Sequence, residues 1–152
     1  MKNYLLILAF TFTLFSCEKK NDQNDDIDKV DLFLDKYNGV VWLGDESTAD
    51  DSYYLAFYKN PGSFNSWETD QDSSYCFPTI FGQANTFGQI VTVMEENEAT
   101  LLLSVMDEDS AISSVKITVL DQGSNLKTEI IESNGDRDLD YWTRSTSLDP
   151  CK

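Results

Sequence analysis

The sequence predicts an all-β protein, in which antiparallel strands form a barrel or a sandwich and one short helix precedes the first strand. From residue 39 onward, apolar and polar side chains alternate with a period of two, which is typical of strands with one buried face. Turn signals rich in glycine, asparagine and proline separate these segments at short intervals. Apolar residues make up 41% of the 152 residues and aromatic residues 12%, so the chain can build the core of one domain.

A short helix is expected over residues 28–37, ahead of the strands. Val30, Leu34 and Tyr37 recur at approximately helical spacing, and Gly39 supplies a stop. Because so short a helix is marginal in isolation, we expect packing against the strands to hold it in place.

Nine segments with the strand pattern follow the helix. In chain order they cover residues 40–43, 53–59, 63–68, 75–81, 87–94, 100–106, 112–120, 126–130 and 139–145. The fourth segment contains Pro78, which has no backbone N–H to donate, so this segment is expected at an edge or at a bulge. The seventh segment alternates most clearly, with Val115, Ile117 and Val119 on one face.

The N-terminus has the order of a secretory signal. Lys2 precedes an apolar run from Tyr4 to Phe15, which is shorter than the roughly 20 residues of a membrane-spanning helix. The sequence Leu14-Phe15-Ser16-Cys17 resembles the lipobox of bacterial lipoproteins. This resemblance implies that Cys17 receives fatty acids such as palmitate and becomes the mature N-terminus. A membrane-spanning helix, or an ordinary cleaved signal with an incidental Cys17, remains as an alternative.

The resulting organisation has three parts: a signal peptide at residues 1–16, a flexible acidic tether at 17–28 and a folded domain at 29–152. The tether has no aromatic residue and is too polar to order itself. We therefore expect a monomer in the cell envelope, anchored by acylated Cys17 to the bilayer of the outer membrane on its periplasmic or surface face.

Charge and composition exclude several classes of function. The net charge of −16 argues against nucleic acid as a partner and against adhesion to anionic lipid through a basic face. The chain has no histidine, which excludes Ser-His-Asp and Cys-His catalysis within it. We expect no catalytic residue and no cofactor. A carboxylate-dependent hydrolase remains a less favoured class, since 27 acidic residues always offer a pair of carboxyl groups.

The three cysteines have two expected roles, which are lipidation and disulfide formation. If Cys17 carries lipid, Cys76 and Cys151 form an even pair, which in an oxidising compartment predicts a disulfide. Two free thiols are the alternative.

Two motifs lie at the ends of the strand region. Gly39-Val40-Val41-Trp42 begins it and Tyr141-Trp142-Thr143-Arg144 ends it, with the hairpin from Phe57 to Phe64 between them. This pattern resembles the bacterial lipocalin-like domains. The resemblance implies a single antiparallel up-and-down β-barrel of about eight strands with a short N-terminal helix. It also implies that Trp42 packs against Arg144, joining the first strand to the last and closing the barrel.

Aromatic residues concentrate in the first half of the domain. The segment from Tyr53 to Tyr58 is apolar on both faces, more than a sheet with one buried face requires. Tyr54, Tyr58 and Trp67 are therefore candidate ligand-binding residues, with plain core filling as the favoured alternative. The expected function is binding of a small apolar or sugar-like molecule, or of an envelope partner, without catalysis. The alternative is a structural or interaction lipoprotein with a filled barrel.

Alternating carboxylates at Asp136, Asp138 and Asp140 form a weak calcium candidate. The order of an EF-hand is not present, and in a strand these side chains would share one solvent-facing side. We expect a solvated loop and no metal.

Overall fold

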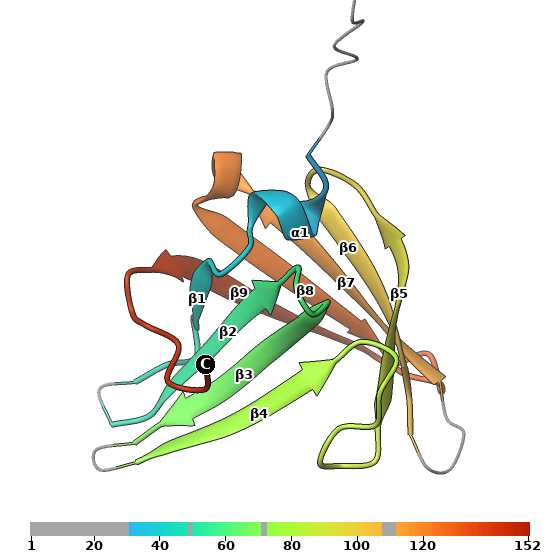
Figure 1. Ribbon diagram of the computed structural model, residues 1–152, viewed down its shortest axis with the longest axis horizontal. Coiled ribbons are helices and arrows are strands. Elements are labelled where there is room, and N and C mark those ends of the chain that lie inside the picture. The colour runs from blue at the N-terminus through green and yellow to red at the C-terminus, as the bar shows by residue number, and fades with distance from the viewer. Residues whose placement is uncertain (1–30, 49, 71–72, 108–111) are drawn as a thin grey trace, which may run out of the picture.

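The computed structural model describes residues 31–48, 50–70, 73–107 and 112–152. These residues form one antiparallel sheet of nine strands with up-and-down connections and one short α-helix (Figure 1). The predicted all-β class is confirmed, with nine strands in place of about eight. The signal peptide, Cys17, the tether at 17–28 and the first two residues of the predicted domain lie outside the described residues.

The elements follow the order in which the sequence predicts them. They are α1 (Phe33–Lys36), β1 (Val41–Gly44), β2 (Ser52–Tyr58), β3 (Ser63–Thr69), β4 (Ser74–Ile80), β5 (Ile90–Glu96), β6 (Thr100–Met106), β7 (Ile112–Leu120), the 3₁₀ turn η1 (Asp121–Gly123), β8 (Asn125–Ile131) and β9 (Arg137–Ser145). The described part of the chain contains no helix that is both long and apolar enough to cross a membrane.

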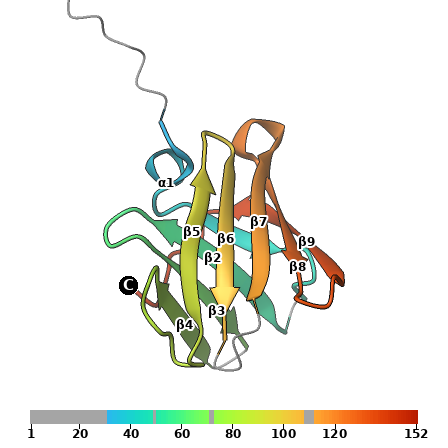
Figure 2. The ribbon, with the colours of Figure 1, turned by 90° about the vertical axis from the view of Figure 1, so that its right-hand side faces the viewer.

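The strand order is β4-β3-β2-β1-β9-β8-β7-β6-β5. The first and last strands are therefore neighbours, as the resemblance implies, and Trp42 lies opposite Arg144 in their register. The sheet also folds over, so that β5, β6 and β7 form a wall in front of β2 and β3 (Figure 2).

The prediction of a closed barrel is wrong, because β4 and β5 do not pair and both are edges of the sheet (Figure 1). Pro78 leaves β4 without one of its backbone donors, which fits its position at an edge. The connection between the two strands takes part of the β5 edge instead. Gly82 N–H donates to the carbonyl oxygen of Val91 at 2.7 Å, and Ala84 bridges to Ile90.

One end of the folded sheet is covered by α1. Phe33 is fully buried and meets Phe57 edge-on, with ring centroids 5.2 Å apart. The Leu34 N–H donates to Glu96 Oε1 at 2.7 Å, and the side chains of Lys36 and Glu98 form an ion pair. The helix covers Phe33–Lys36 and is shorter than the predicted residues 28–37, and these contacts with the sheet hold it.

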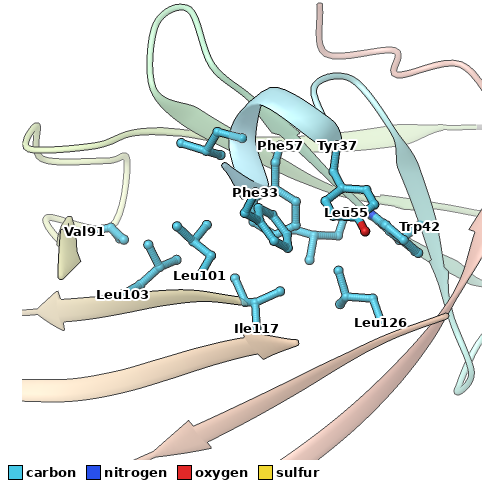
Figure 3. Close-up of a cluster of buried hydrophobic side chains, with 11 residues drawn as sticks. Phe33, Tyr37, Trp42, Leu55, Phe57, Val91, Leu101, Leu103, Ile117 and Leu126 are labelled. Carbon is cyan, nitrogen blue, oxygen red and sulfur yellow. The ribbon is translucent and has the colours of Figure 1, made fainter. Parts of the chain in front are cut away.

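The main core lies inside the fold (Figure 3). Its buried members are Phe33, Leu34, Tyr37, Trp42, Leu55, Phe57, Val91, Leu101, Leu103, Ile117 and Leu126. These side chains come from α1, from Tyr37 directly after it and from six strands, so the core joins both halves of the folded sheet.

A second, smaller cluster lies on the outer face of β1, β2 and β3. It consists of Val41, Ala56, Tyr58 and Trp67, with Tyr54 and Cys151 packed against it. The predicted disulfide between Cys76 and Cys151 is present, with a Cα–Cα distance of 5.6 Å. It holds the C-terminal segment, residues 146–152, against this face of the sheet.

Candidate ligand site at the open end of the sheet

A recess of about 210 Å³ opens at the end of the sheet opposite α1. It is lined by Tyr53, Tyr54, Ser66, Trp67, Glu68, Phe77 and Trp142. Tyr53 stands near the start of β2, whereas Phe57, which meets the helix, stands near the end of the same strand. The length of β2 therefore separates the recess from the covered end.

Strand register explains which of these side chains face inward. Directly opposed residues of an antiparallel pair share a face. Tyr53 alternates with the buried Leu55 and opposes Glu68, and Ser66 opposes Phe77. The residues that face inward at this end therefore include aromatic rings and the carboxylate of Glu68. Tyr54 and Trp67 border the recess from the opposite face of the strands.

Gly44 lets Trp142 lie across the end of β1. The two residues are opposed in the β1–β9 register. A Cβ at Gly44 would lie 3.3 Å from the Trp142 ring and 3.6 Å from Tyr53 Cβ. Because glycine leaves this space free, the indole reaches over β1 toward Tyr53 and completes the wall of the recess.

A second recess of about 190 Å³ adjoins the first and shares Tyr53 and Trp142 with it. Its other lining residues are Gly44, Asp45, Glu46, Asp140 and Tyr141. The Trp142 indole N–H donates to Thr128 Oγ1 at 3.2 Å, and the Thr128 hydroxyl donates to Asp140 Oδ2 at 3.3 Å. These two bonds hold both the ring and the carboxylate in place.

Deeper inside is an apolar cavity of about 80 Å³. Its lining consists of Leu55, Phe57, Phe64, Val91, Leu103, Val105, Val115, Ile117 and Thr128. Thr128 links this cavity to Trp142 at the open end. Ligand pockets typically measure about 300–1000 Å³, so the inner cavity alone is too small for most ligands and the open-end recesses supply most of the space.

The residues that line the open end carry negative charge. The Glu68 carboxylate above all, and also Asp51 and Glu46, raise the pKa of the Tyr53 hydroxyl, because ionised tyrosine would add a further negative charge beside them. Among the residues that the structure describes, no lysine or arginine lines either recess.

The three aromatic residues predicted to bind ligand belong to the outer face. Tyr58 and Trp67 are 7% and 3% exposed, beneath the C-terminal segment. Tyr54 stacks on Trp67 with ring centroids 5.2 Å apart. The Tyr58 hydroxyl donates to Asp149, and burial, followed by this bond, raises the pKa of Tyr58. Tyr58 therefore anchors the C-terminal segment, while Tyr54 and Trp67 also border the larger recess.

Trp42 and Arg144 are neighbours in register, but their side chains differ in environment. Trp42 is fully buried and packs near Tyr37, with ring centroids 6.0 Å apart. Arg144 is exposed. The adjacency of their strands is established by the pairing, and a cation–π contact between the two side chains stays a prediction.

The three aspartates of the weak calcium candidate do not share one solvent-facing side. Asp136 lies in a turn beside Asn134, and Asp140 faces inward and is half-buried against Thr128. In the described ranges, no group of three or more cysteine, aspartate or glutamate side chains is arranged to hold a metal ion.

Sequence reasoning missed the inward aromatic set of Tyr53, Phe77 and Trp142. The alternation contains a signal for Tyr53, which shares a face with Leu55 and Phe57. Both faces of this segment are apolar, however, and the pattern alone does not tell which face is inside.

Comparison with known proteins gave no match with any family model, curated protein or solved structure.

Proposed function

We propose that the protein is a lipid-anchored bacterial lipoprotein whose lipocalin-like domain binds a small, largely apolar ligand without catalysis. The observation that carries this proposal is the recess at the open end, where Tyr53, Phe77 and Trp142 converge above an apolar inner cavity. Aromatic walls around a concave site with a few polar groups are the usual construction of a small-molecule site. The lipobox resemblance supports an anchor at Cys17 in the outer membrane.

The two levels of the site suit different parts of a ligand. The inner cavity offers apolar contact and one hydroxyl, from Thr128. The open end offers ring faces with carboxylates around them. A ligand bound here would place its apolar part inward and its polar part at the mouth.

A structural or interaction lipoprotein is the second candidate function. The observation that favours it is the size of the inner cavity, about 80 Å³, because most of the interior is filled by the side chains of the protein. In this alternative the open end binds no small molecule, and the protein contacts an envelope partner through its surface.

A fluorescence titration separates the two functions. The full chain in phosphatidylcholine nanodiscs is titrated with the neutral dye N-phenyl-1-naphthylamine, and nanodiscs without protein give the background. We expect saturable binding that Phe77→Ala weakens roughly fivefold, since it removes an aromatic contact worth about 1 kcal/mol. Leu139→Ala is the matched control, because Leu139 is exposed on the outer face of β9. Equal titrations for the Phe77 variant and the native protein, or no saturable binding, would favour the interaction role.

The anchor is tested separately. Cells expressing the native protein or Cys17→Ser are labelled with palmitate. Label on the native protein alone supports the anchor, and equal label on both contradicts it.

A further inference from the structure

The carboxylates at the open end are fixed against its aromatic rings. Glu68 is directly opposite Tyr53 in the register of β2 and β3. Asp140 accepts a hydrogen bond from Thr128, which in turn accepts one from Trp142. Each of these two rings is therefore accompanied by a carboxylate that the sheet itself positions.

Among the residues that the structure describes, these carboxylates also have no neutralising partner. Within the described ranges, no lysine or arginine forms an ion pair with Asp45, Glu46, Glu68 or Asp140. Lysines and arginines of the described ranges form ion pairs at other places in the fold. They join Lys36 to Glu98, Lys59 to Asp35, and both Lys127 and Arg137 to Glu129. The raised pKa of Tyr53 is consistent with an uncompensated negative potential at this end.

Aromatic rings beside carboxylates favour a ligand that carries a positive charge. The face of an aromatic ring attracts a cation, and the attraction grows as the cation leaves water. The carboxylates would repel an anionic ligand. A neutral ligand would exclude water from the carboxylates without offering a charge in its place. A positive group near Glu68 and Asp140 satisfies both the rings and the carboxylates.

We propose that the open end binds a small organic cation with an apolar body, whose quaternary or protonated amine lies between Tyr53 and Trp142 beside Glu68. The apolar body extends past Thr128 toward the inner cavity. This inference rests on the proposed function and adds the charge of the ligand to it.

A pair of isosteric probes tests the inference. Phenyltrimethylammonium and tert-butylbenzene have the same shape and differ by a positively charged nitrogen in place of a carbon. Binding of each is measured by saturation-transfer NMR on the full chain in phosphatidylcholine nanodiscs, with empty nanodiscs as reference. We expect the cation to bind roughly tenfold more tightly than the neutral probe.

Two charge variants locate the effect. Glu68→Gln with Asp140→Asn removes two charges at the open end and keeps the shapes of the side chains, so we expect the preference for the cation to fall to about threefold or less. Asp31→Asn with Glu95→Gln removes two exposed charges next to the helix-covered end and should leave the preference unchanged.

The outcomes are distinct. A cation preference that only the open-end variant reduces supports the inference. Equal binding of both probes, or a preference that both variants reduce equally, overturns the inference and leaves the proposed function standing. Binding of neither probe overturns both.

Discussion

Removing the disulfide that holds the C-terminal segment should lower the free energy of unfolding by an amount that follows from the length of the loop it closes. The disulfide joins residues 75 positions apart and holds this segment over the outer cluster. Replacing both cysteines, Cys76→Ser with Cys151→Ser, frees a loop of that length in the unfolded chain. The loop-entropy relation then gives a loss of about 4.5 kcal/mol in the free energy of unfolding.

The assay is urea unfolding of the full chain, followed by circular dichroism in the native protein and in the double serine variant. Asp149, which accepts hydrogen bonds from Tyr58 and from Asn65 Nδ2 at 2.7 Å, should keep the segment docked in the variant. We therefore expect a lower midpoint with a steeper dependence on urea, because the unfolded chain exposes more surface without the cross-link. A loss below about 1 kcal/mol would refute the reasoning, because the cross-link would then restrict the unfolded chain far less than its length implies.

Three further predictions concern the main core, the anchor of the C-terminal segment and the open end. Phe57→Ala should lower the free energy of unfolding by about 3–5 kcal/mol, because it empties a fully buried site beneath α1, and a loss under about 1 kcal/mol in urea unfolding would contradict the core as described. The folded-state pKa of Tyr58 is raised above its unfolded value near 10, so its contribution to stability is complete below about pH 10 and is lost as the pH rises toward the folded-state pKa. Tyr58→Phe should therefore lose less stability than the native protein between about pH 10 and 12, and parallel pH profiles of the urea midpoint would contradict this. Gly44→Ala should displace the Trp142 ring and weaken binding of N-phenyl-1-naphthylamine, at a stability cost of about 1–3 kcal/mol, and an unaltered titration would show that the ring position does not matter.

Much of the sheet could be predicted from the sequence because its signals are local. Alternation and turn residues located all nine strands, and of the two positions that the missing N–H of Pro78 allowed, an edge or a bulge, β4 takes the edge. Closure could not be predicted in the same way. It depends on whether two distant edges meet, and here the connection through Gly82 occupies the β5 edge that β4 would need.

The candidate site was harder to predict because it depends on which face of β2 is inside. Tyr53, Leu55 and Phe57 face inward, while Tyr54 and Tyr58 are equally apolar but face outward. The alternation along β2 does not explain why aromatic residues also occupy its outward positions. They belong to an outer cluster against which the C-terminal segment packs, and the cysteine pair was the one sign of it.

The central claim is that the open end of the sheet, and not the outer aromatic cluster, binds a small apolar molecule. The indole N–H signals of the three tryptophans test it directly, once they are assigned by single replacement with phenylalanine in the full chain. On titration with tert-butylbenzene, we expect a saturable shift of the Trp142 signal, a smaller shift of Trp67, which borders the recess from the outer face, and little change at Trp42, which is fully buried in the core. An unmoved Trp142 signal, or a shift of Trp67 larger than that of Trp142, would contradict it.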